Sequence, residues 1–178
     1  MPNDPGPSDS SHEHASALEQ LVAEQRAPLT RYAARLLGDP DRARDVAQDV
    51  FIKLLVQPAE AVDGHAVEWL FTVCRHRSFD ILRKEGRMKP WDHGQLEAMP
   101  AAEPPPGQAA ESAETKAALL RLVSGLPPKQ QEAVRLKFQN GFSYKEIARI
   151  TDSSVSAVGF LIHTALARLR REWAIQLP

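Results

Sequence analysis

Apolar residues recur at every third or fourth position along most of the chain, which is the spacing of one face of an α-helix. No β-hairpin signal competes with this pattern, and no internal repeat is visible. We therefore expect an all-α protein with three helices before a proline-rich segment and four after it. The expected helices cover approximately residues 16–37, 40–57, 67–86, 115–123, 128–139, 144–150 and 154–173.

Capping signals mark several helix ends. Asp39 can cap the second helix, and Pro40 suits its first position because the missing amide donor costs nothing there. Ser143 and Glu146 form the pattern of a capping box. The other end signals are Pro28 as a point of interruption in the first helix, Gly38 at its end, and Asp63 as a candidate cap of the third.

A segment rich in proline, alanine and acids separates the two groups of helices. Residues 88–115 contain five of the 14 prolines and show no sustained helical period. Because proline fixes φ and lacks an amide donor, this segment should be an extended linker with little structure of its own. The expected organisation is a disordered N-terminus (1–15), a helical domain (16–88), an acidic linker (89–114) and a second helical domain (115–178).

The composition is that of an ordinary soluble protein, with 43% apolar residues among 178. No run approaches 18 apolar residues, and the N-terminus lacks a basic-then-apolar signal pattern, so we expect no membrane insertion and a cytoplasmic protein. Cys74 is the single cysteine and falls on an apolar helical stripe. We expect it in the core, since one thiol makes neither an internal disulfide nor a good zinc site.

The net charge of −1 is unevenly divided along the chain. Residues 65–90 carry six basic groups against three acids, and residues 116–178 carry ten against four, whereas residues 91–115 hold five acids and no Lys or Arg. Two basic segments joined by an acidic one favour two contacts with a polyanion, because screening limits attraction to roughly 10 Å. Solvated helix faces would carry the same charges.

The helix before the linker has aromatic rings outside its expected core stripe. That stripe comprises Val67, Leu70, Phe71, Cys74, Ile81 and Leu82. The opposite face holds Trp69, Thr72, His76, Asp80, Arg83 and Arg87, with Phe79 at its margin. Rings beside cations require either a packing explanation, in which Trp69 contacts a neighbouring helix and Phe79 widens the core stripe, or a binding one.

Near the C-terminus, a helix of two turns, the break "TDSS" and a longer helix make a helix-turn-helix pattern. Such a pair presents the start of its second helix to base edges in the DNA major groove. The expected core stripe of the long helix is Val155, Val158, Ile162, Ala165, Leu166 and Leu169. The opposite face, which is unusually apolar, holds Ser156, Ala157, Phe160, His163, Thr164 and Arg171. A helical hairpin of unrelated purpose is the alternative.

From Leu18 to Arg171 the chain resembles the extracytoplasmic-function (ECF) type of bacterial RNA polymerase sigma factor. The stretch "LTRYAARLLGDPDRARDVAQDVFIKLL" is similar to the opening helices of that family, and "WLFTVCRHRSFDILRKEGR" to its promoter-melting helix. The stretch "GLPPKQQEAVRLKFQNGFSYKEIARI", followed by "SVSAVGFLIHTALARLR", resembles the final domain of that family. The match is specific because two weak motif sets occur in the right order around an acidic linker.

The resemblance implies a transcription initiation factor that captures unpaired non-template bases of the −10 element. Stacking on a ring contributes about 1 to 3 kcal/mol per base, and cations hold the adjoining phosphates, which would explain the rings on the third helix. The implied single-strand contacts are Asp63, Gly64, His65, Trp69, Arg75, His76, Phe79, Asp80, Arg83 and Arg87.

Two further surfaces are implied by the resemblance. An acidic polar patch of Asp45, Gln48 and Asp49 would bind core RNA polymerase, although a solvated face would look the same. The acidic linker would run through the polymerase toward the RNA exit path. The implied contacts with the −35 duplex are Lys145, Arg149, Ser154, Ser156, Ala157, Phe160, Leu161, Thr164 and Arg168, with Arg171 a further backbone contact.

Several of these positions depart from the family pattern. Arg44 stands where an acid is usual, and His76 where Asn is common. Gly159, Phe160, Leu161 and Thr164 replace the usual Lys, Ser, Arg and Arg. We therefore expect weaker duplex binding than is usual. Either Ala157, Phe160 and Thr164 contact thymine methyl groups, or a protein partner covers Phe160 and Leu161.

The expected activity is binding without covalent chemistry, cofactor or metal, since no phosphate-cradling glycine loop, HExxH pair or nucleophile motif occurs. The expected partners are core RNA polymerase and promoter DNA, with an anti-sigma protein as a further candidate. A stand-alone helix-turn-helix regulator is one alternative, and it would need a basic recognition helix. A degenerate sigma-like protein-interaction module is the other, and the apolar Phe160 and Leu161 favour it.

Overall fold

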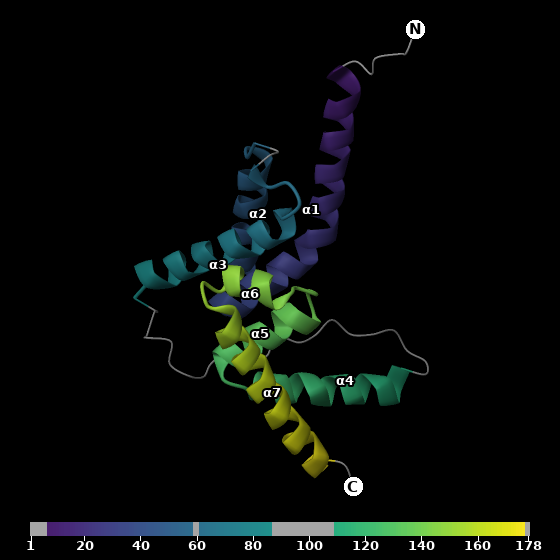
Figure 1. The fold of residues 1–178 in the computed structure, drawn as a ribbon, viewed down its shortest axis with the longest axis vertical. Coiled ribbons are helices and arrows are strands. Elements are labelled where there is room, and N and C mark those ends of the chain that lie inside the picture. Colours follow the sequence, from purple (N-terminus) through teal and green to yellow (C-terminus); the bar gives the residue numbers. More distant parts are fainter. Residues whose placement is uncertain (1–6, 59–60, 87–108, 177–178) are drawn as a thin grey trace. The chain divides into compact units, whose positions relative to one another are not determined.

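The structure, a computed structural model, describes the backbone of residues 7–58, 61–86 and 109–176. Every regular element in these ranges is an α-helix, which confirms the all-α fold class (Figure 1). The chain divides into two compact units, unit 1 (Met1–Glu85) and unit 2 (Gly86–Pro178). The described side chains are those of residues 16–58, 61–86 and 115–174.

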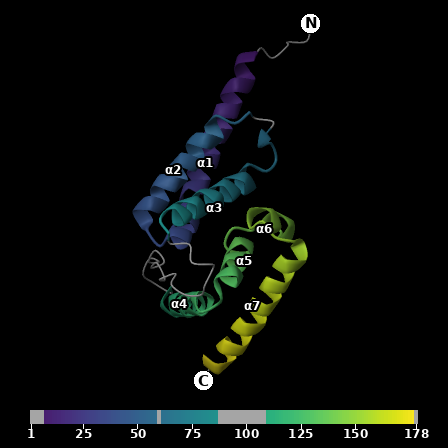
Figure 2. The ribbon, with the colours of Figure 1, turned by 90° about the vertical axis from the view of Figure 1, so that its left-hand side faces the viewer.

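Three helices build unit 1: α1 (Pro7–Leu37), α2 (Pro40–Leu55) and α3 (Ala66–Lys84). After a tight turn, α2 runs back along α1, and α3 packs against both (Figures 1 and 2). The turn requires Gly38, whose φ of +68° lies in the left-handed region that a side chain disfavours. Each helix thus contacts the other two and buries one stripe.

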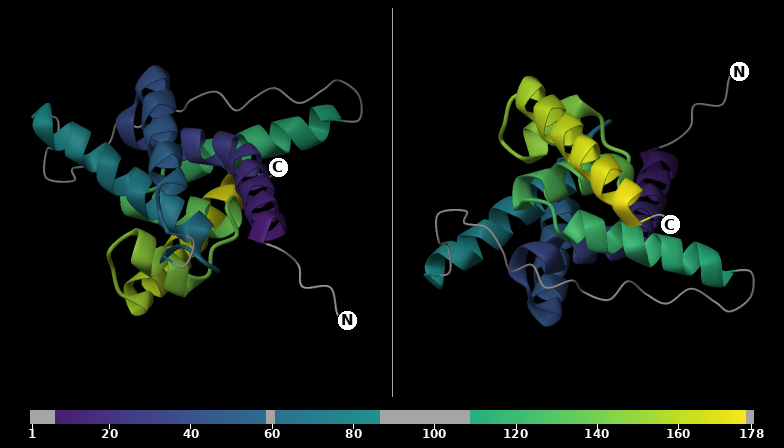
Figure 3. Two further views of the ribbon diagram at one scale, coloured as in Figure 1. Left: turned by 90° about the horizontal axis from the view of Figure 1, so that it is seen from above. Right: turned by 90° about the horizontal axis from the view of Figure 1, so that it is seen from below.

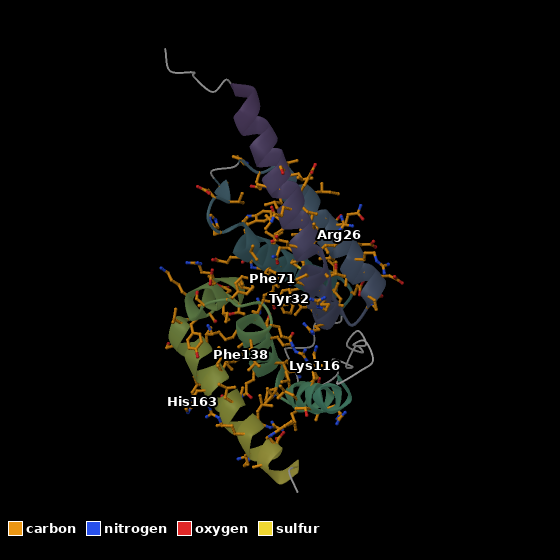
Figure 4. The ribbon with its side chains drawn as sticks, turned by 90° about the vertical axis from the view of Figure 1, so that its right-hand side faces the viewer. Arg26, Tyr32, Phe71, Lys116, Phe138 and His163 are labelled. Atoms are coloured by element: carbon orange, nitrogen blue, oxygen red, sulfur yellow. The ribbon has the colours of Figure 1, made fainter. Side chains whose placement is uncertain are left out.

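The core of unit 1 is centred on Phe71, which is fully buried. Its ring packs against that of Tyr32, with centroids 5.1 Å apart and an interplanar angle of 42° (Figure 4). Such pairs add about 0.5 to 1.5 kcal/mol beyond the burial of their area. Leu29, Ala33, Val50, Leu54, Leu70 and Cys74 are the neighbouring side chains that are also fully buried or nearly so.

The buried stripe of α3 differs in part from the expected one. Leu70, Phe71 and Cys74 are buried as expected, and Ser78 is buried with them. The Ser78 hydroxyl donates to the Cys74 carbonyl oxygen at 2.8 Å, which satisfies it inside the core. Apolar periodicity could not mark a serine as a core residue. The expected stripe residues that are only partly buried are Val67, Ile81 and Leu82.

The first helix is longer than expected. It begins at Pro7 and not near Ser16, so residues 7–15, which we expected to be disordered, are helical. Proline suits the first turn of a helix, because its missing amide donor has no partner there. The helix also continues through Pro28, because the packing of the residues that follow outweighs the loss of one backbone hydrogen bond.

The start of α2 confirms the predicted cap. The Asp39 carboxylate accepts hydrogen bonds from the backbone N–H groups of Asp41 at 3.0 Å and Arg42 at 3.2 Å. Pro40 is the first residue of the helix, as predicted. These bonds satisfy amide groups that have no partner within the helix.

Four helices build unit 2: α4 (Ala109–Ser124), α5 (Pro128–Phe138), α6 (Tyr144–Ile150) and α7 (Val155–Gln176). The long helix α7 contacts each of the other three (Figure 3). Residues 109–114, which we assigned to the linker, belong to α4, because alanine and glutamate favour a helix once the prolines have ended. The rest of the expected linker, 89–108, lies outside the described residues.

The core of unit 2 is built along α7. One cluster joins α4 and α5 to the C-terminal half of α7 and contains Leu122, Val123, Leu126, Val134, Ala165 and Leu169, with Leu166 and Trp173 packed against it. Val158 and Ile162 are buried nearer the start of α7. The predicted stripe of α7 is therefore confirmed at Val158, Ile162, Ala165 and Leu169. Leu166 is partly buried against the cluster, and Val155, the first residue of the helix, is 49% exposed.

Two polar side chains that the sequence analysis missed lie at the junction of α4 and α5. The Gln131 amide donates to the carbonyl oxygens of Ser124 at 2.9 Å and Leu126 at 2.8 Å. These bonds satisfy carbonyl groups at the end of α4 that lack helical partners. Arg135 lies beside them and donates to the Ser124 hydroxyl at 3.4 Å, and burial lowers the pKa of its guanidinium. The junction is thereby fixed.

No single helix in the described ranges is long and apolar enough to cross a membrane, and α6 and α7 have that length and composition only as a pair, across a 105° bend. Among the same residues, no three His, Cys, Asp or Glu side chains are grouped so that they could hold a metal ion.

The thiol of Cys74 tests the packing of unit 1. Burial raises the pKa of the thiol to about 12, an effect that a hydrogen bond between the thiol and the Ser78 side chain partly offsets. Because the thiolate is the reactive form, the native protein should react with a disulfide reagent at least about a hundredfold more slowly than the urea-unfolded chain. The absorbance of the released thiol of the reagent measures the reaction, and it reports on Cys74 alone because the chain has a single cysteine. Equal rates in the two states would mean that α3 is not packed as described.

Candidate nucleic-acid and polymerase interfaces

One face of α3 carries most of the residues predicted to bind single-stranded DNA. Trp69, His76 and Arg83 follow one another at intervals of seven, which places them on the same side of the helix. His76 and Arg83 are exposed and Trp69 is partly buried. None of the three is sealed in the core of unit 1, so this face can meet a ligand.

Arg75 and Phe79 form a pair on α3. The guanidinium carbon of Arg75 lies 4.6 Å from the centroid of the Phe79 ring, within the range of a cation–π contact. Both side chains are partly buried. The sequence analysis selected each residue but missed the pairing, although their separation by one helical turn was the signal. They therefore act together as a flat ring that already carries a cation.

Asp80 and Arg83 form an exposed ion pair, with 2.8 Å between a carboxylate oxygen and a guanidinium nitrogen. Such pairs contribute only about 0 to 1 kcal/mol, so a phosphate could replace Asp80 at little cost. In this structure the carboxylate of Asp80 is the partner of Arg83, and its predicted contact with DNA stays a prediction. Arg87 lies outside the described residues.

The turn before α3 holds the other predicted single-strand residues. Asp63, Gly64 and His65 are all exposed, while Val62 beside them is buried and anchors the turn. Gly64 has φ of +69°, and the Nδ1 atom of His65 lies 2.7 Å from the Asp63 carbonyl oxygen. The predicted cap at Asp63 is wrong, because this turn places His65 at the cap position of α3, where it makes no side-chain capping bond.

The predicted polymerase patch lies on the outer face of α2. Asp45, Gln48 and Asp49 are all exposed. A carboxylate oxygen of Asp49 is 3.5 Å from a guanidinium nitrogen of Arg77 on α3. Arg44 replaces a usual acid in the family pattern, and it pairs with Asp41 at 2.9 Å.

An apolar surface that the sequence analysis missed continues the face of α2. Ile52, Leu55 and Val56 are 53%, 59% and 74% exposed. Ile52 and Val56 follow Asp49 at helical spacing, so the acidic patch and the apolar surface adjoin. The signal was their position outside the buried stripe of Val46, Val50 and Leu54.

The helix-turn-helix is formed by α6 and α7, which are bent by 105° relative to each other. Asp152 makes the turn with φ of +51°, and the Ser153 N–H donates to the Ala148 carbonyl oxygen at 2.9 Å. The Ser154 hydroxyl then accepts from the Ala157 N–H at 3.1 Å, as an N-cap does. The angle lies within the roughly 90 to 120° of such motifs.

The capping box predicted for α6 is confirmed. The Ser143 N–H donates to a Glu146 carboxylate oxygen at 2.7 Å, and the Glu146 N–H donates to the Ser143 hydroxyl at 3.3 Å. Hydrogen bonds with the side chain and then the backbone of Ser143 hold the pKa of the Glu146 carboxyl below its usual range. The box fixes the first turn of α6.

The outer face of α7 carries the residues predicted to contact the −35 duplex. Ser156, Ala157 and Phe160 are exposed. The large apolar side chain of Phe160 is 67% exposed. Leu161 and Thr164 are partly buried. Figure 4 shows His163 on the side of α7 that faces away from α5.

The predicted phosphate contacts lie at both ends of this face. Lys145 and Arg149 are exposed on α6, and Arg171 is exposed on α7. Arg168 donates to the Glu172 carboxylate at 2.7 Å, which balances part of its charge.

Gly159 lies beside the ring of Tyr144. A Cβ atom at this position would lie 3.8 Å from a ring carbon of Tyr144, which is an ordinary van der Waals distance, so this contact does not itself require glycine. The Lys137 ammonium lies 5.5 Å from the centroid of the same ring. Tyr144 therefore helps to hold the start of α6 against α7.

The models of two protein families match the chain, one before and one after the expected linker. Residues 21–88 match Sigma-70 region 2, and residues 116–169 match Sigma-70, region 4. The RNA polymerase sigma-E factor of Streptomyces avermitilis is 30% identical over 165 residues, which are 91% of this chain and 88% of that protein. The ECF RNA polymerase sigma factor SigE of Mycolicibacterium smegmatis is 28% identical over 156 residues, 85% of this chain but 60% of that protein. The chain belongs to the ECF sigma factors of the sigma-70 family.

A solved structure supports the fold of this sigma factor. The sigma factor RpoE from Bartonella quintana, in complex with the anti-sigma factor NepR, superposes with a TM-score of 0.63. The alignment covers 89% of this chain and 98% of that chain at 21% sequence identity. The likeness is one of fold.

The capping box of α6 gives a pH-dependent prediction. A carboxyl whose pKa is lowered in the folded state contributes stability above its unfolded pKa, and this contribution is lost as the pH falls through the folded pKa. We expect Glu146→Gln to cost about 0.5 kcal/mol at neutral pH and nothing at low pH, where Glu146 is itself protonated. Urea unfolding followed by NMR signals of α6 measures both. A difference that persists at low pH would contradict the assignment.

Proposed function

We propose that this sigma factor recruits core RNA polymerase through the outer face of α2 and directs it to promoters with its other two surfaces. The face of α3 and the turn before it would take the unpaired −10 strand, and α6 and α7 would take the −35 duplex. The observation that carries the proposal is the match of units 1 and 2, in order, to regions 2 and 4 of sigma-70.

Docking through α2 is supported by its chemistry. Three exposed polar or acidic residues, Asp45, Gln48 and Asp49, stand beside the exposed apolar Ile52 and Val56. Charged groups at an interface steer association and fix register, while apolar side chains supply burial. A basic partner surface with an apolar edge would be complementary to this face.

Capture of single-stranded DNA is supported by the composition of the α3 face. Trp69 supplies a partly exposed ring, and the pair of Arg75 and Phe79 supplies a ring with a bound cation. Bases of any sequence can stack on such rings, and Arg83 is placed to hold a phosphate once it leaves Asp80. These contacts exist only with unpaired bases, so their binding energy favours the open duplex.

Binding of duplex DNA by unit 2 is supported by its charge. Residues 116–178 carry ten basic groups and four acids. This excess of basic groups gives residues 116–178 a positive net charge, as phosphate binding requires.

We further infer that the factor acts by binding alone, without a chemical step, in the cytoplasm where RNA polymerase works. An anti-sigma protein is a proposed partner by analogy with RpoE of Bartonella quintana, which was solved with one. A stand-alone DNA-binding regulator would bind its sites without polymerase, and a protein-interaction module would bind no promoter. Run-off transcription with purified core polymerase separates the three, because only an initiation factor yields promoter-specific transcripts.

The α2 docking face can be tested by charge reversal. Asp45→Lys should weaken binding to core polymerase about tenfold or more, because it places a like charge against the basic partner surface. Glu24→Lys, which reverses an exposed acid on α1, is the matched control and should bind as the wild type does. Fluorescence anisotropy of the labelled factor measures both affinities. Equal losses in the two variants would indicate general electrostatics rather than a docking site.

Promoter melting can be tested at Trp69. Trp69→Ala should slow open-complex formation on duplex promoters by about tenfold, as expected when one stacked base is lost. A template already unpaired at the −10 element should recover most of the rate. Protection of the Cys74 thiol shows whether unit 1 of the variant is folded. An unaltered rate on duplex promoters in a folded variant would exclude Trp69 from the site.

A further inference from the structure

Phe160 occupies a position on α7 that packing does not explain. Its side chain is 67% exposed, although its neighbours Val158 and Ile162 on the other face are fully buried. Exposure of a large ring to water is unfavourable, at about 25 cal/mol for each Å² of apolar surface. A folding role within the described part of unit 2 is thus excluded, and the ring is available to a ligand.

The hydroxyl groups near Phe160 are already engaged within the protein. The Thr164 hydroxyl donates to the Phe160 carbonyl oxygen at 2.8 Å and accepts from the Gln130 amide at 3.2 Å. Its only hydrogen is thereby used, so toward a base Thr164 can offer its methyl group or a remaining lone pair, but no donor. Ser154 accepts the Ala157 N–H as a cap and shares a hydrogen bond with Ser156 at 3.0 Å.

The face also lacks the groups that usually read guanine. Between Ser154 and Ala167 the sequence contains no Lys or Arg, so the bidentate contact of arginine with the guanine edge has no donor there. Ala157 and Phe160 are exposed and apolar. In the major groove, the apolar group that distinguishes one base from the others is the C5-methyl of thymine.

The charges around the face favour DNA over an apolar protein groove. Lys145 and Arg149 lie exposed on α6, and Arg170 and Arg171 lie exposed further along α7. Cations on both sides of an apolar patch match a duplex, in which phosphates flank a row of methyl groups. An apolar protein partner would bring no anionic groups to Lys145, Arg170 and Arg171, whereas the phosphates of duplex DNA would.

We propose that α7 reads the −35 duplex mainly through thymine methyl groups, with Phe160 as the residue that determines specificity and with Ala157 and Thr164 beside it. This inference rests on the proposed binding of duplex DNA by unit 2, and it names the sequence class: a −35 element in which contacted positions are thymine. The helices α6 and α7 pack against each other, with the Tyr144 ring beside Gly159, one residue before Phe160. The Phe160 ring and the phosphate contacts of α6 therefore keep a fixed relation.

The experiment uses the full-length factor bound to core polymerase. Promoter fragments are first selected from random DNA by this holoenzyme and sequenced. Each thymine of the selected −35 element is then replaced by deoxyuridine, which keeps every hydrogen-bonding group and removes only the methyl. We expect about a fourfold loss of affinity for each methyl group in contact.

Two variants locate the contact. Phe160→Ala should lose affinity for the thymine promoter and should no longer distinguish thymine from deoxyuridine at one or two positions. Phe138→Ala is the matched control, since Phe138 has a 60% exposed ring at the end of α5 and is not part of α7. It should retain the full discrimination of the wild type.

The outcomes separate the inference from the proposed function. Wild-type holoenzyme that selects a −35 element but ignores deoxyuridine, or selects an element without thymine, overturns methyl reading and leaves duplex binding intact. Unchanged affinity and discrimination in Phe160→Ala overturns the role of Phe160 and favours a protein partner for that ring. If no −35 sequence is selected at all, the proposed function of unit 2 fails with the inference. The deoxyuridine measurement needs no variant, so a misfolded Phe160→Ala would not prevent a result.

Discussion

Burial of one stripe of α3 against α1 and α2 is the interaction on which the function of unit 1 depends. A helix in a three-helix unit has one face to bury, and here Leu70, Phe71 and Cys74 fill it, with the Phe71 ring 5.1 Å from that of Tyr32. Because these residues are fixed inside, Trp69, His76 and Arg83 are fixed outside. The exposed ring surface, which is unfavourable in water, is held there by the stability of the core behind it.

The same division into a buried and an outer face governs unit 2, with different chemistry. There α7 buries Val158, Ile162 and Ala165 and presents Ala157 and Phe160. The outer face of α3 combines rings with cations, as stacking on unpaired bases requires, whereas that of α7 is apolar with its cations at a distance. The proposed function accounts for this difference, because the face of α3 would meet single strands and that of α7 a duplex groove.

Helical periodicity and capping rules predicted most of the fold, because both depend on residues near in sequence. The cap at Asp39 and the box of Ser143 and Glu146 are examples, and the buried stripe of α7 is another. Asp63 was wrongly assigned as a cap because the left-handed backbone at Gly64 moves the start of α3, so that His65 lies at the cap position. Gln131 was missed because its hydrogen bonds cap a different helix, and Ser78 because a polar core residue is invisible to apolar periodicity. Exposure of Ile52 and Val56 and the pairing of Arg75 with Phe79 were both compatible with helical spacing, but only the packing of the three helices decides which surface stays uncovered and which side chains meet.

The central claim is that the outer face of α3 grips unpaired bases of the non-template strand. Photo-crosslinking tests it most directly, with halogenated pyrimidines placed singly in the non-template strand of the −10 element and the holoenzyme held in the open complex. The account predicts that crosslinked peptides come from residues 62–86, with Trp69 the main site. Crosslinks confined to other helices or to core polymerase, in complexes that are open by footprinting, would contradict it.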